Sequence, residues 1–126
     1  MRIAVTGASG NIGSSLLEAC EKNAEIEEIV AISRRRPAWE VARTRWIEAD
    51  VLDDDLERHF EGVDAVVHLA WAIQPSHDLE LLERTNVEGS HRVFEAAAAA
   101  GAGKVVYASS VGAYSSGPVD RTVDES

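Results

Sequence analysis

A glycine-rich turn near the start of the chain has the residue types and the spacing of an anion-binding site. An apolar run at residues 1–5 leads into it, and glycines follow at positions 7, 10 and 13. Gly7 would permit a tight turn, Gly10 would let backbone approach a pyrophosphate, and Gly13 would let the next helix pack closely on a sheet. The N–H groups at the start of that helix would then face the phosphates. The turn predicts a dinucleotide phosphate site formed by Gly7, Gly10, Asn11, Ile12 and Gly13, and a purely structural turn is the alternative.

A pair of arginines follows the second apolar run of the chain, residues 29–32. Enzymes that prefer NAD place an acidic side chain there to bind the ribose 2′-hydroxyl. This chain has Ser33, Arg34 and Arg35 instead. Because an arginine fork suits a 2′-phosphate, we expect Arg34 and Arg35 to favour NADP over NAD.

Basic residues are concentrated in the same region. Five of the twelve lysines and arginines fall at positions 34, 35, 36, 43 and 45. This spacing predicts one concentrated anion site in an otherwise acidic protein, and a solvated basic loop is the alternative.

Five short apolar runs must position these residues. They span residues 1–5, 29–32, 46–49, 65–69 and 105–108. Helical patterns fill most of the gaps, with a short helix expected at 53–60, a long one at 78–100, and an apolar stripe of Ile12, Leu16, Ala19 and Cys20 on the first helix. The alternation predicts an α/β fold, a Rossmann-like doubly wound parallel sheet of about five strands in the order 3-2-1-4-5 with helices on both faces.

Composition bounds the class of protein. The 126 residues suit one domain, and 45% hydrophobic content is ordinary for a globular protein. A formal net charge of −10 argues against nucleic acid or an anionic membrane as a partner. No apolar run approaches the ~20 residues that span a bilayer, and no signal peptide is evident, so we expect a cytoplasmic protein. The four histidines lack the spacing of a metal site.

Several further motifs occur in a characteristic order. Asp50-Val51, His68-Leu69-Ala70 and the segments 85–90 and 108–114 follow the glycine turn. Together they resemble the extended branch of the short-chain dehydrogenase/reductase superfamily, the NAD(P)-dependent epimerases, dehydratases and reductases. The resemblance covers essentially the whole chain but only the N-terminal portion of such an enzyme.

The resemblance implies roles for residues at the ends of the third and fourth strands. Asp50 and the next backbone amide, at Val51, would hold the adenine edge, although an aspartate there also suits a turn cap. Leu69, Ala70 and Trp71 would line the cofactor and substrate side. Trp71 departs from the family, in which small residues are usual, so the indole either lines the substrate space or covers the loop.

Two polar residues further along also match the family. Asn86 would lie beside the cofactor and help order the active site, and a side chain capping local backbone is the alternative. Ser110 matches the catalytic serine that hydrogen-bonds the reacting oxygen. The tyrosine and the lysine four residues after it are not found, because Glu18 and Ala100 stand four positions before the two lysines, Lys22 and Lys104.

The resemblance therefore implies the NAD(P)-binding part of an oxidoreductase that transfers hydride at a secondary alcohol or carbonyl of a small-molecule substrate, such as a nucleotide sugar. We expect this chain, one domain over residues 1–126, to bind cofactor without turnover. It is either a fragment that ends before the tyrosine–lysine segment and the substrate lobe or a complete small protein. A non-catalytic NADP(H)-sensing or interaction module is the alternative function. The fifth strand would lie near a sheet edge, which predicts a homo-oligomer.

Overall fold

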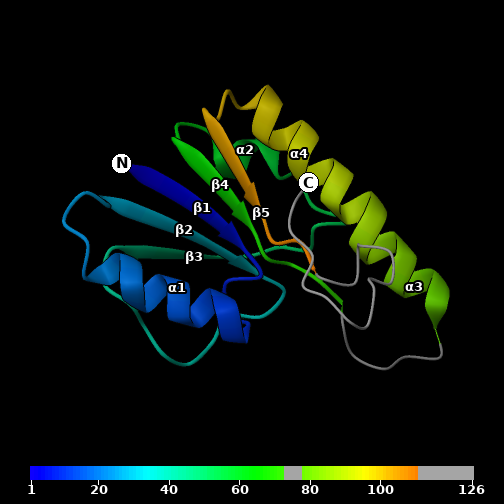
Figure 1. Cartoon of the computed structure of the whole chain (residues 1–126), viewed down its shortest axis with the longest axis horizontal. Helices are drawn as coiled ribbons and strands as arrows, with labels where there is room; N and C mark the ends of the chain where they lie inside the picture. Colours follow the sequence, from blue (N-terminus) through cyan, green and yellow to red (C-terminus); the bar gives the residue numbers. More distant parts are fainter. Residues whose placement is uncertain (73–77, 111–126) are drawn as a thin grey trace, which may run out of the picture.

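A single parallel sheet organises the computed structural model, which describes residues 1–72 and 78–110. Its strands are β1 (Arg2–Thr6), β2 (Glu28–Ser33), β3 (Thr44–Glu48), β4 (Ala65–His68) and β5 (Lys104–Tyr107). They lie in the order β3-β2-β1-β4-β5, and every neighbouring pair is parallel (Figure 1). The predicted Rossmann-like fold and strand order are thereby confirmed.

Helices cover both faces of this sheet (Figure 1). Helix α1 (Asn11–Glu21) packs on one face, and α2 (Glu57–Phe60) and α4 (Gly89–Ala99) pack on the other. The chain enters α4 from α3 (Leu79–Glu83) through η1 (Arg84–Glu88), a single π-helical segment. The predicted long helix at 78–100 is thus almost continuous, but it contains a π turn that the sequence pattern did not indicate.

Helix α2 is shorter than the helix predicted at 53–60, and aspartate side chains hold a turn before it. The Asp50 N–H donates to Asp54 Oδ2 over 2.7 Å, and the Leu52 N–H donates to Asp50 Oδ1 over 2.9 Å. Such side-chain bonds compete with helical hydrogen bonds. The chain therefore turns here and forms the helix later.

The core consists of two apolar layers, one on each face of the sheet. Alternate residues of β1 and β2 point to opposite faces, so Ala4 and Val30 pack toward α4 whereas Val5 and Ile29 pack toward α1. On α1 the predicted stripe is right in part: Leu16 and Cys20 are partly buried against the core, but Gly13 and Leu17 are the buried residues, and Ile12 is 67% exposed. The helix turns this way because Gly13 has to pack against the backbone of the glycine turn.

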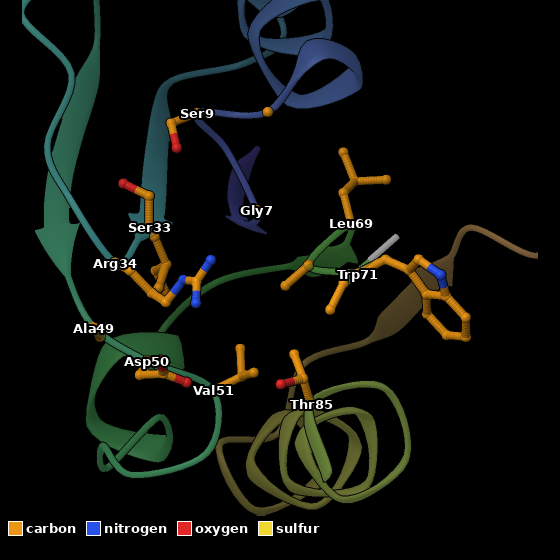
Figure 2. Close-up of a pocket in the computed structure, with 14 residues that line it drawn as sticks. Gly7, Ser9, Ser33, Arg34, Ala49, Asp50, Val51, Leu69, Trp71 and Thr85 are labelled. Atoms are coloured by element: carbon orange, nitrogen blue, oxygen red, sulfur yellow. The ribbon is translucent and has the colours of Figure 1, made fainter. Parts of the chain in front are cut away.

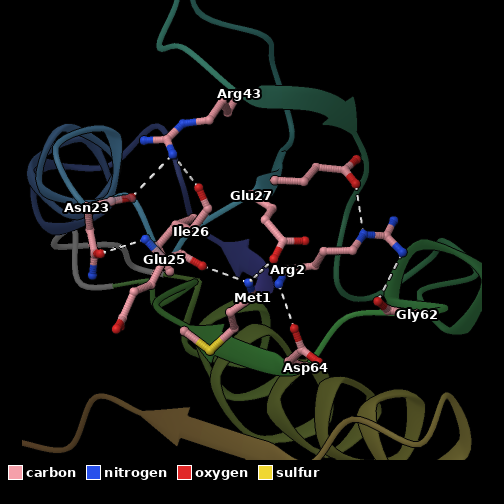
Figure 3. A network of polar contacts seen from close by, with 10 residues as sticks. Met1, Arg2, Asn23, Glu25, Ile26, Glu27, Arg43, Gly62 and Asp64 are labelled. Carbon is pink, nitrogen blue, oxygen red and sulfur yellow. Dashed lines mark hydrogen bonds and ion pairs between the residues drawn. The ribbon is translucent and has the colours of Figure 1, made fainter.

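A polar network holds the sheet at the end where β1 begins (Figure 3). The Arg2 N–H donates to Asp64 Oδ2 over 2.6 Å, and the Arg2 guanidinium reaches Glu28 and the Gly62 carbonyl. The glycine turn follows Thr6 at the opposite end of the strand. The carboxyl edge of the sheet is left for other contacts. Within residues 1–72 and 78–110, none of the helices has both the length and the apolar character needed to cross a membrane.

Candidate functional site

A cleft of about 220 Å³ opens at the carboxyl ends of the central strands (Figure 2). In open α/β sheets this edge, at the point where the strand order reverses, is where ligands bind. This volume is below the ~300–1,000 Å³ usual for ligand pockets. The cleft is lined by Gly7, Ser9, Gly10, Ile32, Ser33, Arg34, Ala49, Asp50, Val51, Leu69, Ala70, Trp71, Ala72 and Thr85.

The lining brings together eight of the residues predicted from sequence. They are Gly7, Gly10, Arg34, Asp50, Val51, Leu69, Ala70 and Trp71. Six further residues line the cleft without having been predicted to: Ser9, Ile32, Ser33, Ala49, Ala72 and Thr85. Ser33 and Ala72 adjoin predicted residues, so strand ends were an available signal for them, and Thr85 opens the family-like segment 85–90, which was an available signal for it. Asn11, Ile12, Gly13, Arg35, Asn86 and Ser110 are not among the lining residues.

Backbone contacts require glycine at two positions of the turn. Gly7 has a φ of +71°, and a Cβ built there would lie 2.6 Å from both the Ala70 nitrogen and the Leu69 carbonyl carbon. A Cβ on Gly13 would overlap the Gly7 carbonyl oxygen and lie 2.6 Å from the Ala8 carbonyl oxygen. The turn is therefore pressed against both the end of β4 and the first turn of α1.

The start of α1 presents backbone donors. The first backbone bond at this end runs from the Ser14 N–H to the Gly10 carbonyl over 2.8 Å, and the N–H groups of Asn11, Ile12 and Gly13 have no partner in the part of the chain that the structure describes. Gly10 supplies no side-chain cap, and the first turn holds no acidic residue. The positive end of the helix dipole is therefore left for an external anion. Since the Ile12 side chain is exposed, Ile12 would contribute to anion binding through its backbone N–H group.

Arg34 is the arginine that lines the cleft. Its guanidinium points into the space between Gly7 and Asp50 (Figure 2) and has no hydrogen-bond or ion-pair partner among residues 1–72 and 78–110. The loop that carries it is held by the Ser33 hydroxyl, which donates to the Arg35 carbonyl over 2.8 Å. The structure thus separates Arg34, which faces the cleft, from Arg35, which is exposed outside the lining.

The predicted cluster of five arginines does not form. Arg43 has a φ of +60° and donates to carbonyls at the end of α1 and just beyond it, including those of Asn23 and Ile26 (Figure 3). Arg36 pairs with Glu40, and Arg45 pairs with Glu28 at 3.1 Å. These three guanidinium groups are used within the fold, which corrects the prediction of one concentrated anion site.

Asp50 and Val51 lie at the floor of the cleft. Asp50 caps the following turn through Leu52, which is the alternative role left open by the sequence, and it also lines the cleft. Val51 is 6% exposed, and its N–H has no partner among the described residues. The Val51 carbonyl accepts from Arg92 Nε at 2.9 Å, and a Cβ on Gly89 would lie 2.8 Å from Val51 Cγ2. The carbonyl of Val51 is bonded to Arg92 and its side chain packs against Gly89, while its N–H group remains available to a ligand.

The segment that leaves β4 forms the opposite wall. Asn86 holds this segment with two hydrogen bonds, since its side chain accepts from the Ala72 N–H at 2.8 Å and donates to the Ala72 carbonyl at 3.0 Å. The side chain therefore binds backbone fourteen residues away in the sequence, not the local backbone of the alternative that the sequence left open. Trp71 is 50% exposed at the mouth of the cleft, and its ring centroid lies 6.5 Å from that of Tyr107.

His68 ends β4 directly behind this wall. Its ring lies between the Thr6 and Ser90 hydroxyls and stacks on Tyr107 with a centroid distance of 5.4 Å. Burial lowers the pKa of His68 to about 4, because the charged ring would lose its hydration. The imidazole is neutral at physiological pH and acts as a hydrogen-bonding core residue.

Ser110 lies three residues beyond β5, is exposed, and is not among the residues that line the cleft. The segment 117–126, which resembles the stretch before the family tyrosine, lies outside the described residues. Within the described ranges, the structure holds no group of three or more histidine, cysteine or carboxylate side chains that could bind a metal ion.

Comparison with known proteins places these features in a family. The model of the NAD dependent epimerase/dehydratase family matches residues 3–126. Among curated proteins, the L-arabinose 1-dehydrogenase (NAD(P)(+)) of Haloferax volcanii is 38% identical over 109 residues, which cover 86% of this chain and 40% of that protein.

Solved structures agree with this family match. MoeE5 in complex with UDP-glucuronic acid and NAD has 34% identity and a TM-score of 0.75, covering 87% of this chain and 37% of that one. UDP-glucuronic acid 4-epimerase from Bacillus cereus in complex with NAD has 26% identity and a TM-score of 0.80, covering 94% of this chain and 43% of that one. The chain thus spans about two fifths of the length of each of these proteins.

Proposed function

Since this chain belongs to the NAD-dependent epimerase/dehydratase family, we propose that it binds NADP at the carboxyl edge of its sheet and is the cofactor-binding part of an oxidoreductase or epimerase that acts on a sugar. One observation carries the proposal. The partnerless N–H groups at the start of α1 and the Arg34 guanidinium are presented at the same edge of the sheet. Two phosphate-binding elements so placed suit a dinucleotide with a 2′-phosphate.

The described residues fit such a cofactor part by part. The glycine turn, with the N–H groups of Asn11, Ile12 and Gly13, would bind the pyrophosphate, and the close backbone approaches at Gly7 and Gly13 shape that cradle. Arg34 would bind the 2′-phosphate.

The other half of the cleft would receive the adenine and the nicotinamide. The partnerless N–H of Val51, beside Asp50, suits the adenine edge. Leu69, Ala70 and Trp71 would face the nicotinamide side, and Asn86 would act through the Ala72 backbone that it holds.

When bound, the nicotinamide would supply or accept hydride, and the chain would position it. We propose a secondary alcohol or carbonyl of a sugar or nucleotide sugar as the reacting group, with Ser110 hydrogen-bonded to its oxygen. The support is that the related proteins include an arabinose dehydrogenase and two proteins solved with UDP-glucuronic acid or named for it. Because residues 1–126 contain no tyrosine followed four positions later by lysine, we expect this single domain to bind cofactor without turnover.

Calorimetric titration with NADPH and with NADH tests the proposal, with Arg34→Ala and Arg35→Ala as a matched pair. Charge-assisted hydrogen bonds contribute about 1.5–3 kcal/mol, and exposure of Arg34 favours the lower end of that range. We therefore expect Arg34→Ala to lower the affinity for NADPH about tenfold or more, while the affinity for NADH stays within about twofold of its value in the unaltered chain. Arg35→Ala, which removes the same charge outside the cleft lining, should change neither by more than about twofold.

Two results would contradict the proposal. Equal weakening of NADPH and NADH by Arg34→Ala would refute the 2′-phosphate assignment. Binding of neither dinucleotide by the unaltered chain would refute the cofactor site itself.

A further inference from the structure

A buried chain of hydrogen bonds runs from β1 through β4 to the π turn. Thr6 and His68 are register partners at the ends of their strands, and Thr6 Oγ1 lies 2.6 Å from His68 Nδ1. On the other side of the ring, Nε2 lies 3.0 Å from Ser90 Oγ, which donates to the Asn86 carbonyl over 2.6 Å. Thr6, His68 and Ser90 are at most 5% exposed, so water does not compete for these bonds.

The direction of each hydrogen bond in this series is determined by the direction of its neighbour. Ser90 has a single hydroxyl proton, and the Asn86 carbonyl can only accept, so Ser90 must receive its second bond from a protonated Nε2. A neutral imidazole carries one ring proton, so Nδ1 accepts and the Thr6 hydroxyl donates. The geometry therefore fixes the Nε2–H tautomer of His68.

The neighbours that the structure gives the His68 ring among the described residues carry no charge. Thr6 from β1, Ser90 and Phe94 from α4, and Tyr107 from β5 contact His68, and only Tyr107 among these four neighbours is titratable. The tautomer therefore follows from hydrogen bonding alone.

Both ends of this series of hydrogen bonds connect to residues that line the cleft. Thr6 precedes Gly7, whose backbone is pressed against Leu69 and Ala70. At the other end, the side chain of Asn86 makes the two bonds to Ala72. The π turn η1 carries Asn86, and the N–H of Gly89 reaches back to the Arg84 carbonyl, five residues earlier. π turns of this kind are frequent at functional sites.

We propose that His68 is a positioning residue that, through Thr6 and Ser90, couples the glycine turn to the Ala72 wall of the cleft. The effect on cofactor affinity rests on the proposed function, whereas the coupling of the two segments does not. His68 itself does not line the cleft, so it acts through the residues it holds.

Nuclear magnetic resonance of the unaltered chain and of Ser90→Ala tests the coupling. Two-bond proton–nitrogen correlations should report the Nε2–H tautomer in the unaltered chain. In Ser90→Ala, the Ala72 N–H should exchange with solvent about tenfold faster relative to the Ile29 N–H of β2. Ser15→Ala is the matched control, because Ser15 Oγ also donates to the carbonyl four residues back, that of Asn11, but has no histidine bonded to it. It should leave Ala72 exchange unchanged.

A second pair of variants, Thr6→Val and Thr6→Ser, measures the consequence of the coupling for NADPH binding. This pair also tests the proposal if Ser90→Ala does not fold. Thr6→Val removes the hydroxyl and keeps the shape, whereas Thr6→Ser keeps the donor. We expect NADPH affinity to fall about tenfold in Thr6→Val, or ~1.4 kcal/mol, and to stay within about threefold in Thr6→Ser.

Each outcome bears on one of the two claims. An Nδ1–H tautomer, or equal Ala72 exchange in Ser90→Ala and Ser15→Ala, would overturn the coupling. Equal NADPH affinity in Thr6→Val and Thr6→Ser would overturn the positioning role. Failure of the unaltered chain to bind any dinucleotide would remove the proposed function, while the tautomer and exchange measurements would still decide the coupling.

Discussion

Acidification from pH 7 to pH 5 should destabilise this protein through one buried side chain. Burial lowers the pKa of His68 from 6.5 to about 4. Between these two values the unfolded chain holds a proton on this ring that the folded chain does not hold. The free energy of unfolding therefore falls as the pH falls, and the contribution is fully lost below the folded pKa.

The magnitude follows from the two pKa values. At pH 7 the ring is largely neutral in both states, and the cost is only ~0.2 kcal/mol. At pH 5 the unfolded ring is protonated while the folded ring is mostly neutral, which costs about 2 kcal/mol and rises to about 3 kcal/mol below pH 4. The folded ring takes up its proton only at lower pH, because a proton on Nδ1 would require the Thr6 hydroxyl to stop donating to the ring and turn to accept from it.

Urea unfolding at pH 7 and pH 5, at one ionic strength, measures this loss. In His68→Gln the pH-dependent loss should shrink by about 2 kcal/mol, whatever the variant does to absolute stability. His91→Gln is the matched control, because His91 is exposed on α4, and it should keep the full loss. A wild-type loss below ~0.5 kcal/mol, or the same loss in His68→Gln, would refute the reasoning.

Two further predictions concern the glycine turn and the sheet edge. Gly13→Ala should lower the free energy of unfolding by about 1–3 kcal/mol, because its methyl would meet rigid backbone at Gly7 and Ala8, and thermal unfolding checks this. Gly10→Ala, with a nearest contact of 3.3 Å, is the milder comparison, and an equal loss in both would contradict the packing argument. Within residues 1–72 and 78–110, β5 pairs only with β4 and exposes Val106 at 53%, so we expect self-association in sedimentation; a monomer at high concentration would argue against it.

The strand order was predictable because each strand of this sheet is a short apolar run and the motifs follow a familiar order. The placement of α1 was predictable only in part, since Leu16 and Cys20 of the predicted stripe pack against the core but Ile12 does not. Ile12 is apolar yet 67% exposed, while Gly13 faces inward because only a glycine fits against the backbone of Gly7 and Ala8. A periodic pattern of apolar side chains cannot identify a glycine as an inward-facing residue, and Gly13, which has no side chain, is such a residue on this helix.

The residues of the site that lie at strand ends were predictable from the sequence. The role of a side chain was not predictable where a contact with a residue distant in the sequence determines that role. Arg34 and Arg43 look equivalent in the sequence, but Arg43 reaches back about twenty residues to cap α1, and Arg34 does not. Similarly, Thr85 reaches the cleft from the π turn, for which the sequence carries no recognisable signal. Asp50 has the turn-capping role that local chemistry had suggested beside its family role, whereas Asn86 binds the backbone of Ala72, fourteen residues away, which local chemistry did not indicate.

The tight contact between Gly89 and Val51 constrains how this chain can diverge. A single methyl at position 89 would lie 2.8 Å from Val51 Cγ2, and the bond from Arg92 to the Val51 carbonyl opposes a shift of the Val51 backbone away from it. A larger residue at 89 is therefore tolerated only after residue 51 has become smaller, which makes the order of substitutions matter. The two positions, thirty-eight residues apart, should vary together among descendants of this sequence and rarely one at a time.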